Sequence, residues 1–268
     1  MKETKRIEVS FMSATLLLVV ICSNLIIGIL LGISGISGFL LPLIYVGFLG
    51  MPVKDSLALS FLAFAVSGII GAFSYLRSKN MDLRLALFLS IGSIPGAFLG
   101  VQINVLISDT LAKLLLYLFI FIAGLSLFRQ NKERTDVDAS SLKILHNNSM
   151  LILIGLLTAA ISSLTGAGGP ILLVPLLASL GVNIRVVVGV SLLNSVIIAL
   201  PAVFGYFAYA TMDHLGVLII SSLIGITIGI ITGAKFAEKV PTYHLRIFIA
   251  IITIISAVYM LVTLFFGT

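Results

Sequence analysis

The chain has 268 residues, of which 60% are hydrophobic and only 10% are charged, and its formal net charge is +6. Its mean hydropathy of +1.25 excludes a soluble domain, in which about half of the residues are apolar and about a quarter are charged, and predicts a polytopic membrane protein. The basic residues form short clusters at the ends of apolar segments, as membrane insertion requires, so the positive charge predicts no nucleic-acid partner.

The chain begins with a basic stretch, Met1–Arg6, and an apolar run over about 11–31. The run is too long for the 7–15-residue core of a signal peptide, and it leads into a glycine motif rather than a cleavage site. We therefore expect it to be retained as the first membrane segment. The further apolar segments of the first half cover about 39–50, 56–76, 84–106 and 111–128, and those of the second half cover about 149–164, 170–182, 187–209, 214–234 and 245–266.

A polar stretch over 129–148 separates the two sets of segments. The predicted organisation is a first transmembrane repeat over 1–128, a polar linker over 129–148 and a second transmembrane repeat over 149–268. At this length there is no room for a separate soluble domain.

Two glycine-rich stretches interrupt the apolar sequence. Residues 32–42 read GISGISGFLLP, and residues 162–175 read SSLTGAGGPILLVP. Hydrocarbon offers no water to a freed N–H or C=O, so broken backbone at membrane depth survives only when protein buries it or when it lines a polar cavity. Paired breaks in two halves of a chain indicate the substrate site of a transporter.

The two halves match residue by residue, which indicates an internal duplication. Gly35 and Pro42 correspond to Gly168 and Pro175 at an offset of 133 residues. Further matches at an offset of 131 or 133 join Ser60 to Ser191, Tyr75 to Tyr206, Asp82 to Asp213, and Gly92, Gly96 and Gly100 to Gly225, Gly229 and Gly233.

The second segment of each half is too short to span a bilayer alone, because about 12 residues of helix rise about 18 Å against about 30 Å of hydrocarbon. The first two segments of each half are thus expected to form a re-entrant hairpin, one broken span, or a full span followed by a half-helix. Corresponding loops of the two halves have opposite basic bias: Arg77, Lys79 and Arg84 crowd a first-half loop, whereas Lys235 and Lys239 crowd the next loop of the second half. This reversal favours inverted repeats over parallel ones, although the overall count of Lys and Arg barely separates the two topologies.

Through both halves, the sequence resembles the sulfite exporter TauE/SafE family of membrane permeases. The similarity is strongest in the second half, at residues 165–177 (TGAGGPILLVPLL), 189–195 (GVSLLNS) and 229–233. The first half departs from the family pattern, since Ile33, Ser34, Ile36 and Ser37 interrupt its glycines and no asparagine follows Ser60. The resemblance implies transport of a small and often sulfur-containing anion, such as sulfite or a sulfonate.

Helix N-termini can hold an anion without buried cations, because each presents unpaired N–H groups and about half a positive charge. The predicted substrate contacts combine such backbone groups with hydroxyl and amide side chains. They are Ser34, Gly35, Ser37, Gly38, Thr165, Gly166, Gly168, Gly169, Ser191 and Asn194. The structural alternative is that these small residues only let helices pack closely in lipid, and we assign that role to Gly96 and Gly229, with Pro42 and Pro175 shaping the short helices.

All ten acidic residues fall at segment ends or in loops, which disfavours a metal-cation site and predicts no metal. No nucleotide or cofactor motif is present, so we expect no cofactor and no ATP drive. Substrate identity, transport direction, the coupling ion (a proton or sodium) and the oligomeric state are left open.

Two other function classes fit parts of the sequence. Both Gly32–Gly35 and Gly35–Gly38 fit the Gly-x-Ser-Gly pattern of intramembrane serine proteases, but His146, His214 and His244 lie at segment ends and give the serine no base. A passive anion channel would tolerate the same broken helices. The favoured interpretation is a non-enzymatic, all-α, multi-pass secondary transporter of the inner (cytoplasmic) membrane, with two inverted repeats that each hold a broken or re-entrant helix pair and three transmembrane helices.

Overall fold

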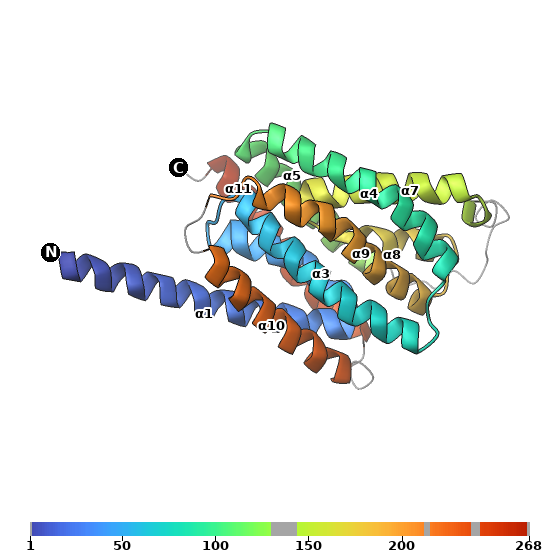
Figure 1. The fold of residues 1–268 in the computed structure, drawn as a ribbon, viewed down its shortest axis with the longest axis horizontal. Coiled ribbons are helices and arrows are strands. Elements are labelled where there is room, and N and C mark those ends of the chain that lie inside the picture. Colours follow the sequence, from blue (N-terminus) through green and yellow to red (C-terminus); the bar gives the residue numbers. More distant parts are fainter. Residues whose placement is uncertain (1, 130–143, 212–214, 237–241, 267–268) are drawn as a thin grey trace.

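The protein is entirely helical in the part of the chain that a computed structural model describes (Figure 1). That part comprises residues 2–129, 144–211, 215–236 and 242–266, with the backbone alone described at 2–14, 127–129 and 242–246. The long helices are α1 (Lys2–Ser34), α3 (Val53–Arg77), α4 (Leu83–Leu106), α5 (Asp109–Arg129), α7 (Asn148–Thr165), α9 (Ile184–Phe207), α10 (Leu215–Phe236) and α11 (Thr242–Phe266).

Eight of the described helices are long and apolar enough to cross a membrane, and two apolar helices are shorter. The second of the short helices is α8 (Gly169–Ser179). The first covers Ser37–Phe48 and changes its winding along its length: it is 3₁₀ over Ser37–Phe39 (η1), α over Leu40–Pro42 (α2) and π over Leu43–Phe48 (η2). The all-α polytopic fold predicted from the sequence is therefore confirmed.

Helices α4 and α7 pack side by side and run in the same direction. Gly92 of α4 lies against the carbonyl of Ile152, and Gly100, two turns further along, lies against the carbonyl of Ala160. The opposite face of α4 exposes large apolar side chains, such as Ile94 and Phe98. Small residues facing the protein and large ones facing lipid are the expected arrangement for a membrane helix.

Helices α1 and α10 form an equivalent parallel pair. A Cβ added to Gly225 would meet the Ile21 carbonyl oxygen, and Gly229 and Gly233 lie against successive turns of α1 at Leu25 and Ile29. Glycine thus sets the close approach of both parallel pairs.

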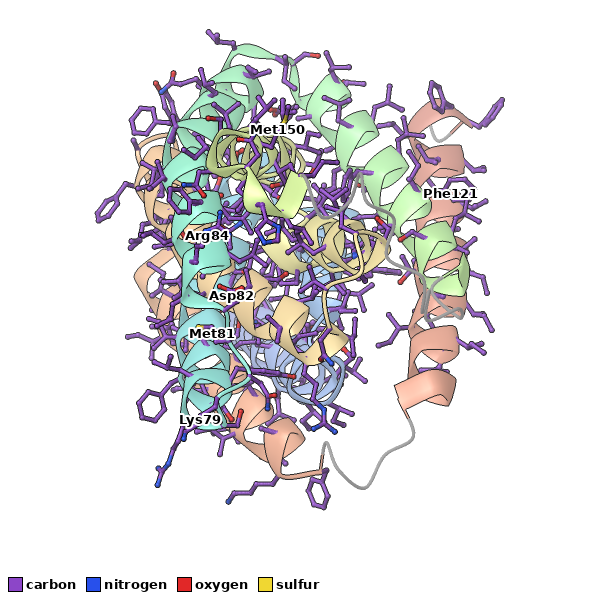
Figure 2. The ribbon with its side chains drawn as sticks, turned by 90° about the vertical axis from the view of Figure 1, so that its right-hand side faces the viewer. Lys79, Met81, Asp82, Arg84, Phe121 and Met150 are labelled. Carbon is purple, nitrogen blue, oxygen red and sulfur yellow. The ribbon has the colours of Figure 1, made fainter. Side chains whose placement is uncertain are left out.

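Helices α3 and α9 form the antiparallel centre of the bundle. Tyr75 near the end of α3 touches Gly189 near the start of α9, while Asp55 at the start of α3 is hydrogen-bonded to Thr211, just beyond the end of α9. The bundle therefore has two ends, which we name face A (the end that holds Asp55 and Thr211) and face B (the end that holds Lys79 and Arg185). Figure 2 looks onto face B, where Lys79, Asp82 and Arg84 surround the start of α4.

These directions fix the path of the chain. Helix α1 runs from face A to face B, and the short helix Ser37–Phe48 turns back, because Gly35 lies against Val188 near face B whereas Gly47 lies against Met260, close to the end of α11. Of the three arrangements that the sequence allowed, the structure has the full span followed by a returning half-helix.

The packing is reciprocal between the halves. The first helix of each half packs on the fourth helix of the other (α1 on α10, α7 on α4), and the third helices pack on each other. The first half starts at face A and the second at face B, where Arg84 donates hydrogen bonds to His146 O and Asn148 Oδ1. The inverted duplication remains a prediction, which this reciprocal packing supports.

Candidate functional site

The first helix break lies between α1 and the short helix Ser37–Phe48. Gly35 has a φ of 74°, a left-handed conformation that glycine adopts without strain, and its N–H donates to the Leu31 carbonyl at 2.7 Å. The Ser34 hydroxyl accepts from the Ile36 N–H at 3.3 Å and donates to the Leu30 carbonyl at 2.7 Å. The chain then restarts as a helix at Ser37.

The second break lies between α7 and α8 and depends on two glycines with positive φ. Gly166, with φ 74° and ψ 12°, ends α7 by donating its N–H to the Ser162 carbonyl. Gly168, with φ 75° and ψ 156°, precedes the first residue of α8, and Pro170 occupies the first turn, where a missing N–H costs little. In the described structure neither the Gly168 nor the Gly169 N–H donates to a protein acceptor.

Side chains from other helices hold this second break in place. The Tyr206 hydroxyl of α9 donates to the Ser163 carbonyl at 2.6 Å, and Asn104 Nδ2 of α4 donates to the Leu164 carbonyl at 2.7 Å. The Ser162 hydroxyl spans the break itself and donates to the Gly168 carbonyl at 3.1 Å. Two of the carbonyls in the last turn of α7, those of Ser163 and Leu164, are thereby satisfied away from water, as membrane depth requires.

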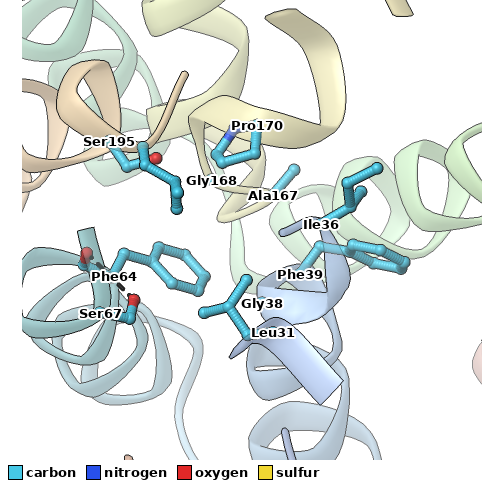
Figure 3. A pocket seen from close by; sticks show the side chains of 11 residues that line it. Leu31, Ile36, Gly38, Phe39, Phe64, Ser67, Ala167, Gly168, Pro170 and Ser195 are labelled. Carbon is cyan, nitrogen blue, oxygen red and sulfur yellow. Dashed lines mark hydrogen bonds between the residues drawn. The ribbon is translucent and has the colours of Figure 1, made fainter. Parts of the chain in front are cut away.

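The two breaks meet across one small cavity (Figure 3). Gly38 and Phe39 line it from the first break, and Ala167, Gly168 and Pro170 line it from the second. The cavity has about 10 Å³ of space, close to the minimum that one water molecule needs. The structure thus shows this region closed, with too little room for a polyatomic anion.

The ring of Phe64 separates the two breaks. A Cβ added to Gly38 would lie 2.9 Å from Phe64 Cε1, and one added to Gly168 would lie 3.2 Å from Cε2 on the other side of the ring. Phe64 stands at the middle of α3, so the parts of the two breaks that touch it, Gly38 and Gly168, lie near the centre of the bundle. Nothing in the local sequence distinguishes this phenylalanine, so the sequence does not predict its place between the breaks.

Helix α9 faces both breaks with one side. Val188 lies against Gly35, and Ser195 Oγ would be 3.1 Å from a Cβ on Gly169. Ser191 stands between these two residues on the same helical face, one turn from each. Ile198, one turn after Asn194, also touches Gly169, the first residue of α8. Asn194 therefore belongs to the side of α9 that is turned toward α8.

The polar atoms at this place are buried and unpaired. Ser191 and Asn194 are 0% exposed and Ser37 is 1% exposed. No hydrogen-bond partner exists in the described structure for Ser37 Oγ, Ser191 Oγ, Asn194 Nδ2 or Asn194 Oδ1. An unpaired buried polar group costs about 1–3 kcal/mol, so these four atoms are candidates for contact with a ligand.

The other predicted contacts are engaged differently. The hydroxyls of Ser34 and Thr165 donate to carbonyls of their own helices, Leu30 and Ile161, at 2.7 Å each, so of the three hydroxyl donors expected at the breaks only Ser37 is free in this conformation. Gly166 lies against Leu57 and Pro42, which brings the proline of one half to the break of the other. Gly96 and Gly229 lie at the α4–α7 and α1–α10 contacts, and Pro175 lies inside α8.

Charge is almost absent from the interior. Among the described residues, Asp55 is the one buried ionisable residue other than tyrosine, and no Lys, Arg or His is buried. Asp55 accepts from the Thr211 N–H at 3.0 Å and from the Thr211 hydroxyl at 3.2 Å, beside a cavity of about 110 Å³ on face A that Lys54 and Asp109 also line. In the same part of the chain, no three His, Cys, Asp or Glu side chains are grouped to hold a metal ion.

A family model described as Sulfite exporter TauE/SafE matches residues 16–260. The chain is 25% identical to the "Probable membrane transporter protein YdhB" of Bacillus subtilis, over 85% of this chain and 94% of that protein. It is 26% identical to the "Probable membrane transporter protein MJ0441" of Methanocaldococcus jannaschii, over 95% and 99% of the two chains, and 23% identical to the "Probable membrane transporter protein YjnA" of Bacillus subtilis, over 88% and 96%. No solved structure matches the chain significantly.

Proposed function

The chain belongs to the sulfite exporter TauE/SafE family of membrane transporters, and on that premise we propose that it is a secondary transporter of a small, sulfur-containing oxyanion across the cytoplasmic membrane. The anion is held near the middle of the bilayer, between the two helix breaks. The observation that carries this proposal is the meeting of both breaks at one cavity, together with buried, unpaired polar groups nearby in the chain. Ser37 and Ser191 each adjoin a residue that lines the cavity, and Asn194 is one turn from Ser191.

The groups around the cavity are suited to an anion. The free N–H groups of Gly168 and Gly169 stand at the N-terminus of α8, where the helix dipole adds about half a positive charge. Ser37, Ser191 and Asn194 supply further hydrogen-bond donors. Of the ten predicted contacts, Gly38 and Gly168 line the cavity, and Ser37, Gly169, Ser191 and Asn194 lie within one helical turn of residues that line it or touch the breaks.

The mechanism follows from the closed state of the site. The ring of Phe64 fills the space between the breaks, and α3 and α9 are tied at face A by Asp55 and Thr211. An anion can therefore reach the breaks only when α3 and α9 separate at one face. We propose that one group of helices rocks about the breaks and opens face A and face B in turn, with the breaks holding the anion in both states.

The distribution of basic residues supports one orientation. Face B holds Arg77, Lys79, Arg84 and Arg185, whereas the described basic side chains of face A are Lys54 and Lys113. Cytoplasmic loops carry the excess of Lys and Arg, and on this ground we propose that face B lies in the cytoplasm.

A proteolytic function has little support. The Ser34 hydroxyl is bound to its own helix, and His146, whose backbone carbonyl accepts from Arg84 at face B, precedes the start of α7 and is remote from the breaks. Ser37 is free, but the described residues bring no histidine or carboxylate to it to act as a base.

Flux into reconstituted vesicles tests the proposal. Sulfite, thiosulfate, alkylsulfonates and carboxylates are each offered, with and without a pH or sodium gradient. Saturable flux of a sulfur oxyanion, with a KM raised about tenfold by Ser191→Ala and by Asn194→Leu, is expected. Ser126→Ala on α5 is the control, because the half-buried Ser126 hydroxyl donates to the Ala123 carbonyl of its own helix at 2.8 Å and does not line the cavity between the breaks. Ohmic conductance without saturation would show a channel instead, and absence of saturable flux of any sulfur oxyanion would overturn the proposal.

A further inference from the structure

Asn194 is the most unusual polar residue of the interior. Its side chain is 0% exposed, and neither its nitrogen nor its oxygen has a hydrogen-bond partner in the described structure. The nitrogen can donate twice, whereas the oxygen can only accept. A fully ionised oxyanion satisfies the nitrogen but leaves the oxygen buried and unpaired, which carries the usual desolvation penalty.

Two other asparagines of the membrane interior show the contrast. Asn24 donates to the Val20 carbonyl and accepts at its oxygen from the Ser222 hydroxyl at 3.0 Å. Asn104 donates to the Leu164 carbonyl and so has a definite structural role, while its Oδ1, like that of Asn194, is buried and unpaired. Asn194 alone among these three has both ends of its amide unused, which indicates a ligand that both accepts and donates.

The charge around Asn194 is insufficient for a divalent anion. The titratable side chains of α9 and of the described helices packed on it lie toward the helix ends: Lys54, Asp55, Tyr75 and Arg77 on α3, Arg84 on α4, and Arg185 and Tyr206 on α9. Arg185 precedes Asn194 by nine residues, about 14 Å of helix. The desolvation cost of an ion rises with the square of its charge, so a dianion costs about four times as much as a monoanion here. The N-terminus of α8 offsets only about half a charge.

Building on the function proposed above, we propose that the site takes its oxyanion as a hydrogen oxyanion, a monoanion that still carries one hydroxyl. That hydroxyl donates to Asn194 Oδ1, and the remaining oxygens accept from Asn194 Nδ2, the Ser191 hydroxyl and the free N–H groups at the start of α8. Sulfite has such a form, hydrogensulfite, near neutral pH, whereas sulfate and alkylsulfonates do not. The proton then crosses the membrane on the substrate, so each transport step moves one negative charge rather than two. No protein carboxylate has to carry that proton, and in the described structure none is buried near the breaks.

Two isosteric probes isolate the hydroxyl. Methylphosphonate in its singly ionised form carries one O–H, and methanesulfonate has the same shape and charge without it. Each is offered as a competitor of sulfite uptake into vesicles that contain the full chain, at a pH where methylphosphonate is mostly monoanionic. Hydrogen methylphosphonate is expected to inhibit at about tenfold lower concentration than methanesulfonate. The Asn194→Leu variant is expected to reduce that ratio to about two or less, whereas Ser126→Ala on α5 keeps it.

The pH dependence provides a second readout that needs no variant. Above the second ionisation of sulfite, the KM expressed as total sulfite is expected to rise about tenfold per pH unit, as the hydrogensulfite fraction falls. The inhibition constant of methanesulfonate, whose charge does not change, is expected to stay within about twofold, which separates titration of the substrate from titration of the protein. Flux into protein-free vesicles is subtracted at each pH.

The outcomes separate the two proposals. Saturable sulfite flux with a pH-independent KM, or equal inhibition by the two probes, would overturn the hydrogen-oxyanion inference and leave the transport function standing. Absence of saturable flux of any sulfur oxyanion would overturn both.

Discussion

Tyr206 on α9 donates a hydrogen bond of 2.6 Å to the carbonyl oxygen of Ser163, in the last turn of α7. The Ala167 N–H, which would be the helical partner of that carbonyl, donates to Ser162 O instead. The Tyr206→Phe substitution therefore leaves a buried carbonyl unpaired, at a cost of about 1–3 kcal/mol. We expect the thermal unfolding midpoint in detergent to fall by several degrees relative to wild type. Tyr209→Phe, at an exposed tyrosine one turn further along, is the control, and equal midpoints for the two variants would contradict this role of Tyr206.

The glycines of the second break are expected to be essential for flux. Gly168 has a φ of 75°, and a side chain there is strained and also meets Phe64, while a side chain on Gly169 meets Ser195. Gly168→Val and Gly169→Val should abolish transport but leave the protein in the membrane fraction, since the α4–α7 and α1–α10 contacts are untouched. Gly216→Val is the control, because a Cβ at Gly216 meets nothing within 4 Å. Wild-type flux in the two break variants would rule out the site.

The α4–α7 contact is expected to be the most sensitive part of the scaffold. A Cβ on Gly96 would collide with the carbonyl oxygen and Cα of Leu156, both of which are backbone atoms that move only with their helix. Gly96→Ala should therefore destabilise the fold by about 1–3 kcal/mol, an overpacking cost, and reduce the yield of monodisperse protein. Gly216→Ala should not. Size-exclusion profiles and unfolding midpoints of the two variants compare them directly.

The Asp55–Thr211 link is expected to hold face A closed. The neutral amide introduced by Asp55→Asn would keep the shape of the side chain but weaken the charge-assisted hydrogen bonds from Thr211 by about 1 kcal/mol, which corresponds to about fivefold more frequent opening.

A cysteine placed at Ser67, which lines the central cavity, reports this opening in a Cys22→Ala background. An impermeant thiol reagent applied at face A should label Ser67→Cys about fivefold faster when Asp55→Asn is present. Asp109→Asn, in the same face A cavity, is the matched control, and identical rates in the two variants would contradict the link.

Face B is expected to be cytoplasmic. Pro52 on face A and Lys79 on face B are both exposed, so a soluble reagent can reach a single cysteine placed at either position. In right-side-out membranes an impermeant maleimide should label Pro52→Cys and spare Lys79→Cys until the membrane is permeabilised. The opposite pattern would place face A in the cytoplasm and reverse the orientation.

The helix breaks were predictable from the sequence because their cause is local. Glycines that can take positive φ, followed by a proline within one or two turns, end one helix and start another, and α7 stops at Thr165 and α8 starts at Gly169 as residues 162–175 indicated. The number of apolar segments was predictable for the same reason, since a membrane span is defined by the composition of about 20 consecutive residues.

Only the tertiary structure decided which atoms face the breaks. The hydroxyls of Ser34 and Thr165 matched the expected chemistry, yet they bind their own helices, while Phe64 and Asn104 gave no sequence signal and act at the breaks. Asn104 and Leu164 are 60 residues apart, and Tyr206 and Ser163 are 43 apart. Membrane helices are apolar on every side, so their polarity does not show which face turns inward. That choice follows from how closely the glycine faces of α1, α4, α7 and α10 fit one another, and shape of this kind exists only after the helices have packed.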